Sequence, residues 1–120
     1  MQYSKTFILE KFDFDSLKQH NLPVPKLGPH QVLIKMKAAS LNFRDLKIVN
    51  GLYARPPNLP ITLLSDGAGK IVKVGLNITK FSIGDRVIPI YMSGWYSGPL
   101  TGRHAGWKAL GGDIDGVASE

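Results

Sequence analysis

Four polar side chains lie close together in SLNFRDLKIVNGLY, residues 40–53: Asn42, Arg44, Asp45 and Tyr53. An amide, a guanidinium, a carboxylate and a phenol supply hydrogen-bond donors, acceptors and an ionisable hydroxyl. Such groups can line an active site, and they can equally serve to begin and end a helix. The stretch alone leaves both interpretations open.

The spacing of apolar residues predicts a short helix in this stretch. Apolar side chains recur at three-residue intervals from Phe43 to Val49, as on one helix face. Asn42 suits the N-cap, and Asp45 three residues later gives a near capping box. Gly51 can take the left-handed position that ends a helix. An N-cap contributes about 1 kcal/mol, so capping alone is a sufficient reason for Asn42, and Arg44 can be a surface residue.

Several catalytic and metal chemistries lack the residues they need. The chain has no Cys, which excludes disulfides, thiol nucleophiles and Cys-ligated zinc. His20, His30 and His104 lie far apart in predicted loops, without acidic residues at metal-site spacing, so we expect surface histidines. Composition leaves a Ser/His/Asp triad open, but no G-x-S-x-G motif is present.

The glycines of DGAGKIVKVG, residues 66–75, only partly match a dinucleotide-binding motif. Val72 replaces the third glycine, and the glycines precede a predicted strand where the motif needs them to follow one and open a helix. We therefore expect Gly67, Gly69 and Gly75 to serve strand bends and close backbone approach. The predicted elements do not alternate as strand, helix and strand, so the sequence does not predict a nucleotide-binding parallel sheet.

The elements that must position the polar stretch are predicted to be mainly strands. Period-two patterns and β-branched or aromatic residues predict strands at 3–10, 31–38, 68–74 and 86–91. A polar loop is predicted through Asn21, a proline-rich loop at 55–60 and a turn at Gly84-Asp85. Pro89 is expected at a sheet edge or bulge.

The last part of the chain is predicted to be mostly loop. From Met92 onward the sequence is rich in glycine, with at most one short helix near Arg103 to Leu110. Short strands with proline and glycine corners and few helices predict a mainly β fold, an antiparallel and partly open β-barrel.

The composition is that of one globular domain spanning residues 1–120, with 43% hydrophobic and 20% charged residues. The net charge of +6 favours anionic partners or simply solubility. No stacking motif or basic helix face is present, so no nucleic-acid partner is expected. The sequence has neither a secretory signal pattern nor a long apolar stretch, so we expect a cytoplasmic protein without a membrane partner.

The order of the segments resembles a known family. GPHQVLIKMKAASLNFRDLKIVNGLY, LPITLLSDGAGKIVKVGLNITKFSIGDRVIP, GWYSGPLT and ALGGDIDGV resemble the N-terminal, GroES-like domain of the medium-chain dehydrogenase/reductase superfamily. The resemblance covers roughly residues 3–117. Its most specific parts are NFRD before a helix, and GAGKIVKVG followed by KFSIGDRV. It implies a GroES-like, partly open antiparallel β-barrel.

The resemblance also bears on metal chemistry. Zinc alcohol dehydrogenases of the superfamily carry a Cys at the position matching Asn42 and a His at the position matching Ser65, while Asp66 stands at a Glu position. Neither Asn nor Ser supplies the missing ligand. The resemblance therefore narrows to the zinc-free branch, similar to quinone oxidoreductases and to the enoyl reductase domains of polyketide and fatty acid synthases.

In that branch, the resemblance implies hydride transfer from NAD(P) to a carbonyl, enone or quinone of a small-molecule substrate. It implies catalytic roles for Asn42 and Tyr53 and cofactor-binding roles for Asn42, Arg44 and Asp45, without a metal. An internal Arg–Asp contact that braces the helix is an alternative for Arg44 and Asp45. Lys47 departs from quinone oxidoreductases, which often have a tyrosine there.

Full-length relatives of this kind continue into a Rossmann domain that binds the nucleotide, and these 120 residues lack it. We therefore expect no turnover by this chain alone. We also expect exposed apolar surface that favours self-association or a homodimer. The alternative is a non-catalytic GroES-like binding module or an inactive fragment.

Overall fold

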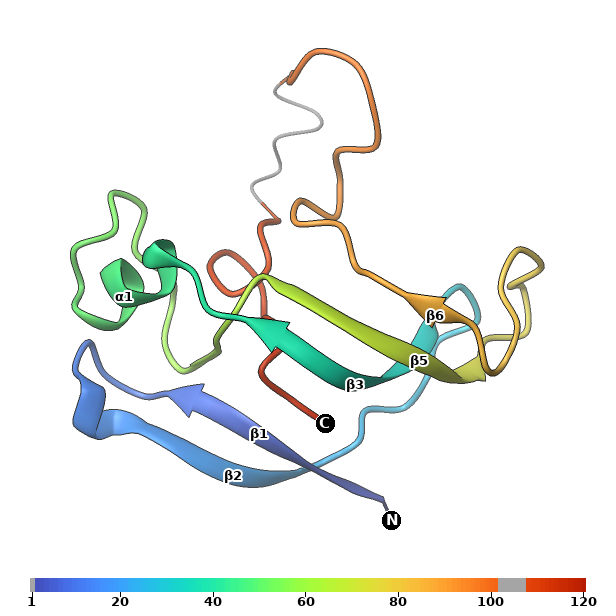
Figure 1. The fold of residues 1–120 in the computed structure, drawn as a ribbon, viewed down its shortest axis with the longest axis horizontal. Helices are drawn as coiled ribbons and strands as arrows, with labels where there is room; N and C mark the ends of the chain where they lie inside the picture. The colour runs from blue at the N-terminus through green and yellow to red at the C-terminus, as the bar shows by residue number, and fades with distance from the viewer. Residues whose placement is uncertain (1, 102–107) are drawn as a thin grey trace.

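The computed structural model describes residues 2–101 and 108–120. Along the chain the elements are β1 (Tyr3–Leu9), the 3-10 helix η1 (Phe14–Ser16), β2 (Leu17–Pro23), β3 (Val32–Ser40), α1 (Phe43–Val49), β4 (Ile61–Thr62), β5 (Asp66–Val74) and β6 (Arg86–Val87). Most of the regular structure is therefore strand, as predicted (Figure 1).

The strands form two antiparallel sheets. One has the order β2-β1-β4 and the other the order β3-β5-β6. The two sheets stay separate and do not close into one continuous barrel (Figure 1). This confirms the predicted partly open, antiparallel architecture.

The long pairing of β3 with β5 agrees with the sequence patterns. In β3, Ile34 and Met36 are half-buried while Lys35 and Lys37 are exposed, which is the predicted alternation. The ladder shifts register at Leu33/Ile34 and again at Met36/Ala38. Such irregularities bend a strand and increase its twist.

The predicted polar loop through Asn21 is wrong, because residues 17–23 form strand β2. This strand pairs with β1 over its whole length, from Leu17 opposite Leu9 to Pro23 opposite Tyr3. Most of its side chains are exposed, so backbone pairing rather than an apolar pattern makes it a strand. It lies at the edge of its sheet.

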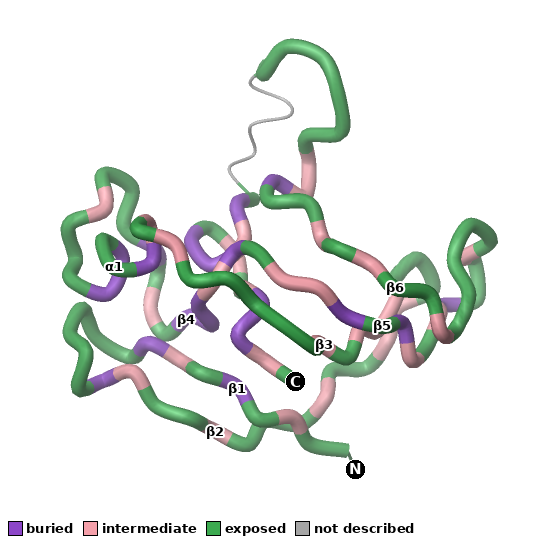
Figure 2. Tube along the Cα trace, in the orientation of Figure 1, coloured by how far each residue is buried: buried purple, intermediate pink, exposed green. Residues whose placement is uncertain are grey.

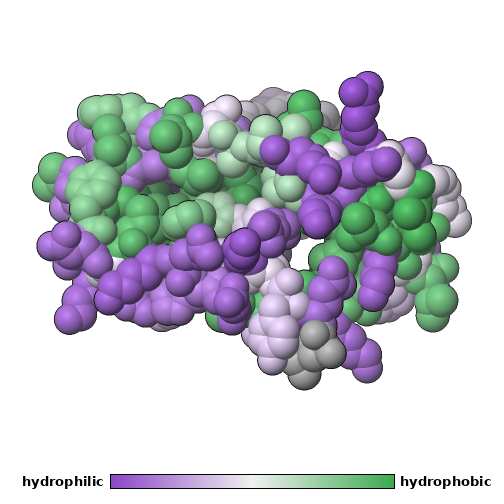
Figure 3. Space-filling model, turned by 60° about the horizontal axis from the view of Figure 1, so that its bottom comes forward, coloured by the Kyte–Doolittle hydropathy of each residue, from purple (hydrophilic) through white to green (hydrophobic). Residues whose placement is uncertain are grey.

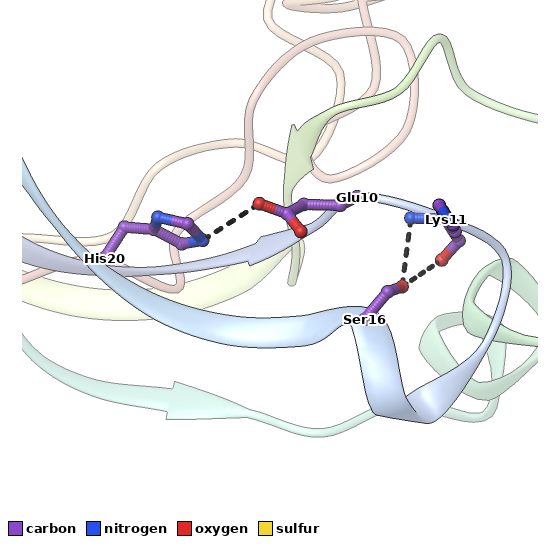
Figure 4. Close-up of polar contacts among 4 residues, drawn as sticks. All are labelled: Glu10, Lys11, Ser16 and His20. Carbon is purple, nitrogen blue, oxygen red and sulfur yellow. Dashed lines mark hydrogen bonds and ion pairs between the residues drawn. The ribbon is translucent and has the colours of Figure 1, made fainter.

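The turn between β1 and β2 is built by side chains (Figure 4). Ser16 Oγ donates to the Lys11 carbonyl at 2.6 Å and accepts from the Lys11 N–H at 2.9 Å. His20 Nε2 lies 3.3 Å from Glu10 Oε1. Because His20 belongs to β2, it is a strand residue rather than the predicted loop residue. The second histidine, His30, contacts the Asn77 amide at 3.0 Å.

Two other predicted elements differ from the structure. The strand predicted at 86–91 is shortened to Arg86–Val87, and Pro89 follows it outside the ladder, where its missing N–H costs nothing. The helix predicted near Arg103 to Leu110 falls largely on residues 102–107, as does His104, and these lie outside the described residues. Of the rest, Ala109 and Leu110 form isolated bridges.

The glycines of residues 66–75 serve close packing, as predicted. A Cβ on Gly69 would lie 2.7 Å from the Lys35 carbonyl oxygen, and one on Gly75 would lie 2.5 Å from that of Pro29. Gly67 and Gly69 stand inside β5, and no helix follows them before β6. They therefore do not form a nucleotide-binding turn.

The buried core lies where α1 meets the β2-β1-β4 sheet (Figure 2). It consists of Leu9, Ile48, Val49, Ile61, Leu63 and Ala118. The last residues of the chain complete it by backbone pairing: Ala118 N–H donates to the Leu63 carbonyl at 3.0 Å and its carbonyl accepts from Phe7 N–H at 2.8 Å. The core is small, so each of its side chains contributes a large share of the buried apolar surface.

Large apolar side chains are also exposed, as predicted. Figure 3 shows hydrophobic residues in two areas of one face, separated by hydrophilic residues. The most exposed include Leu41, Phe43, Leu52, Leu76, Ile88 and Tyr96. Self-association or homodimerisation through such surface stays a prediction. No helix among the described residues has the length and apolar character needed to cross a bilayer.

Replacing Ile48 by Ala should lower the free energy of unfolding by about 2–5 kcal/mol, because its side chain is fully buried. The matched control is Ile88→Ala, where the side chain is 75% exposed and the loss should stay below about 0.5 kcal/mol. Urea denaturation of both variants measures the difference. Equal losses would show that α1 does not depend on this core.

Candidate active site at helix α1

The N-terminus of α1 lies where the sequence predicts, but the Asn42 side chain makes no capping hydrogen bond. Asn42 is the N-cap, with extended backbone (φ −122°, ψ 154°). Its N–H donates to Asp45 Oδ2 at 2.8 Å, which is the contact expected of a capping-box N3 residue. Gly51 follows the C-cap with φ +69°, as its predicted role requires.

The Asn42 side chain points away from its own helix. Its Nδ2 donates to Asp66 Oδ2, the first residue of β5, at 2.6 Å. Ser65 Oγ donates to the same carboxylate oxygen at 3.3 Å. Asp66 therefore fixes which way the Asn42 amide faces, because a carboxylate can only accept from the nitrogen end.

Asp45 is a buried carboxyl, only 5% exposed. Burial raises its pKa above the ordinary value of 3.8, while the hydrogen bond from Asn42 and the charge of Arg44 partly oppose that rise. Asp66 adds a smaller effect that also raises the pKa. Asp45 thus holds the backbone of Asn42, and its carboxyl is buried.

The Arg44 guanidinium lies against two aromatic rings. Its guanidinium carbon lies 5.0 Å from the Tyr53 ring centroid and 5.2 Å from that of Tyr91. Its Nη1 donates to the Leu110 carbonyl at 3.0 Å. Arg44 therefore joins α1 to two aromatic rings and to a segment 66 residues further along the chain.

The cavity beside Arg44 measures about 130 Å³, which is small against the roughly 300–1,000 Å³ of pockets that hold a whole ligand. Its lining consists of Arg44, Tyr53, Arg55, Tyr91, Met92, Ala109, Gly112 and Asp113. Arg55 Nη2 and Asp113 Oδ1 form an ion pair of 3.2 Å there.

The pKa values of the two tyrosines that line this cavity, Tyr53 and Tyr91, shift in opposite directions. The hydrogen bond from Arg44 holds the pKa of Tyr53 below its ordinary value, against the opposing effect of burial, and a hydrogen bond with Tyr91 adds to the lowering. Burial raises the pKa of Tyr91, with the Arg44 charge opposing. Tyr53 is consequently the more acidic phenol of the pair.

The structure therefore divides the predicted site residues into two groups. Asn42 and Asp45 lie at the N-terminus of α1 beside β5, and Arg44 and Tyr53 lie together in the cavity. Sequence reasoning missed Tyr91. Its only signal was a place at the end of a predicted strand, which does not indicate contact with Arg44.

The sequence of this chain matches a known protein family. Residues 28–120 match the family described as the alcohol dehydrogenase GroES-like domain. The chain belongs to this family. It is 48% identical over 104 residues to a zinc-type alcohol dehydrogenase-like protein of Schizosaccharomyces pombe, a match that covers 86% of this chain and 30% of that protein.

Other similar proteins are also described as oxidoreductases. A quinone oxidoreductase of Lama guanicoe is 40% identical over 99 residues, covering 81% of this chain and 30% of that protein. A Sinorhizobium meliloti protein described as an alcohol dehydrogenase superposes with a TM-score of 0.87 at 34% identity, covering 100% of this chain and 36% of its own. The chain thus spans about a third of its relatives, which are oxidoreductases.

A second Sinorhizobium meliloti structure, described as a zinc-binding dehydrogenase and bound to NADP, has a TM-score of 0.81 at 23% identity. It covers 100% of this chain and 35% of its own. That identity supports likeness of fold alone. Together with the profile match, it confirms the GroES-like architecture predicted from the sequence.

Two of these proteins are described as zinc-type or zinc-binding, so the side chains beside the N-terminus of α1 were compared with the ligands that zinc requires. Asn42, Ser65 and Asp66 offer an amide, a hydroxyl and one carboxylate, and the carboxylate already accepts from the other two. Across residues 2–101 and 108–120, no three His, Asp or Glu side chains come together as a metal site would need. These residues do not fit zinc, which takes thiolate, imidazole and carboxylate ligands.

Asp45→Asn should change the pH dependence of stability. A folded-state pKa raised above the unfolded value means that the Asp45 contribution is fully present below that unfolded value and is lost as pH rises through the folded pKa. Asn keeps an acceptor for the Asn42 N–H but does not ionise. The wild type should therefore lose free energy of unfolding relative to the variant as the pH rises from the ordinary value of 3.8 through the raised folded-state pKa.

Denaturant unfolding at several pH values measures this difference. Asp15→Asn is the matched control, because the Asp15 carboxylate is exposed in η1. A difference between wild type and Asp45→Asn that stays constant across the pH range would contradict the burial of an ionisable Asp45.

Proposed function

We propose that this chain forms the N-terminal catalytic domain of a zinc-independent, NAD(P)-dependent oxidoreductase. Its reaction is hydride transfer to the carbonyl, enone or quinone of a small-molecule substrate. The observation that carries the proposal is the hydrogen bond from Asn42 to Asp66, with Ser65 beside it, in a domain of the alcohol dehydrogenase family. These polar groups bind one another in place of a metal.

Asn42 is proposed to orient the reacting groups. Its nitrogen is committed to Asp66, so the amide oxygen is the atom left to accept a hydrogen bond from the carboxamide of a nicotinamide or from a substrate hydroxyl. Asp45 holds the backbone of Asn42 from within the helix. Asn42 and Asp45 therefore belong to the cofactor side of the proposal, with Asn42 as the contacting residue, while Arg44 lies with Tyr53.

Tyr53 is proposed as the proton donor. A bound nicotinamide nucleotide supplies the hydride. Negative charge then develops on the substrate oxygen, and without a metal it must be met by protein donors. The Tyr53 hydroxyl, whose pKa Arg44 lowers, gives its proton to that oxygen and is reprotonated from solvent.

The phosphates of the nucleotide need a binding site other than this one. The glycines that might have cradled them lie inside β5, and among the described residues the one α-helix begins at a capped Asn rather than a glycine turn. We therefore propose that this chain contacts the nicotinamide end of NAD(P) and that most of the cofactor is bound by further sequence of the intact enzyme.

The test uses the complete reading frame that encodes this chain, assayed with NADH or NADPH against enones and quinones. Tyr53→Phe should lower kcat by about 100-fold or more, as loss of a general acid does. Asn42→Ala should lower kcat/KM by disturbing orientation. Tyr96→Phe is the control, since the Tyr96 side chain is 83% exposed. Full activity in the double variant Asn42→Ala, Tyr53→Phe would show that these residues are not the site.

A further inference from the structure

We propose that Arg44 and Tyr91 are positioning residues for Tyr53, and that the three side chains form one unit that presents the Tyr53 hydroxyl proton to a substrate oxygen in the cavity between α1 and residues 109–113. This inference rests on the proposed function. It adds Tyr91, which neither the sequence patterns nor the comparisons single out, and it gives Arg44 a role beside the phenol.

The geometry of Arg44 carries the inference. Its guanidinium lies between two aromatic rings, 5.0 Å from the centroid of Tyr53 and 5.2 Å from that of Tyr91. The Leu110 carbonyl accepts from Nη1 at 3.0 Å and fixes the plane of the group. Nε is buried without a hydrogen-bond partner among the described residues. An arginine needed only to hold Leu110 would not require two rings around its charge.

The direction of donation follows from chemistry. A guanidinium has donors and no acceptor, so only the phenol oxygen of Tyr53 can accept from it. Arg44 and Tyr91 lower the pKa of Tyr53, while the pKa of Tyr91 itself is raised, mainly by burial. Tyr53 lines the cavity together with both residues, and its O–H is a donor that can serve a third group there.

The cavity has room for that third group and not for much more. Its volume of about 130 Å³ is well below the roughly 300–1,000 Å³ of pockets that hold a whole small-molecule ligand. It can therefore admit the oxygen-bearing end of a substrate while the rest lies outside. Arg55 and Asp113 pair with each other at 3.2 Å, so Arg44 is the cation placed next to Tyr53 where negative charge would develop.

A purely structural role is the competing explanation. In that case Arg44 and Tyr91 only join α1 to residues 109–113, and changing them alters stability but not the acidity of Tyr53. Tyr91→Phe separates the two, because it keeps the ring against Arg44 and removes only the hydroxyl. Gly112→Ala gives a second, independent variant: its Cβ would collide with Arg44 Nη2 and displace the guanidinium without removing it.

The first experiment follows tyrosine ionisation by NMR of the chain labelled with 13C at tyrosine Cζ. The chain has four tyrosines, so each signal can be assigned by substitution. We expect Tyr91→Phe and Gly112→Ala each to move the titration midpoint of Tyr53 to higher pH. Lys47→Met is the matched control, since Lys47 lies over Phe43 rather than Tyr53. A Tyr53 midpoint that both variants leave unchanged would overturn the inference.

The second experiment measures the pH dependence of kcat in the intact enzyme. Tyr91→Phe should move the alkaline limb to higher pH by the same amount as the NMR midpoint. A shift by NMR without one in kcat would also overturn the inference, because Tyr53 would then be acidic without being the acid. An intact enzyme that transfers no hydride, with the NMR shift present, would instead overturn the proposed function and leave the Tyr53 unit as a feature of the fold.

Discussion

Helix α1 contacts both sheets, and the positions of Asn42, Arg44 and Tyr53 depend on those two contacts. Ile48 and Val49 pack into the core formed with the β2-β1-β4 sheet, while Asn42 binds Asp66 at the start of β5 in the other sheet. A helix of seven residues is too short to be stable by itself in water. Tertiary contact must therefore hold it, and the same contacts set the geometry of the site.

The residues of the helix contact two different groups of side chains. At its N-terminus a buried carboxyl fixes the N-cap residue, whose amide is turned towards β5. Arg44 of the same helix lies against two tyrosines next to a small cavity. One short helix thus holds Asn42 and Arg44, whereas Tyr53 and Tyr91 lie outside it and reach it through Arg44. A site that must orient one group and protonate another benefits from such a shared support.

The sequence predicted those parts of the fold that depend on local patterns. The β3 alternation and the caps of α1, Asn42 and Gly51, were visible because strand and helix periods and capping residues are local signals. Strand β2 was missed, because it has no apolar alternation and is held by pairing with β1. Tertiary context overrides propensity in such edge strands.

The candidate site was predictable only in part for the same reason. Asn42, Arg44, Asp45 and Tyr53 fall in one short stretch, so a search for clustered polar residues found them. Their division into two groups could not be foreseen, since it follows from contacts with Asp66 and Tyr91 that are distant in sequence. The likeness of order to a known family supplied what the spacing could not, namely the chemistry that such a stretch serves.

The central proposal is that the intact enzyme transfers hydride without zinc, and that the amide, hydroxyl and carboxylate of Asn42, Ser65 and Asp66 bind one another rather than a metal. Metal analysis of the active, intact enzyme tests it most directly, combined with activity before and after treatment with a strong chelator. We predict far less than one zinc per chain and unchanged activity. Activity that rises and falls with zinc content would contradict the account.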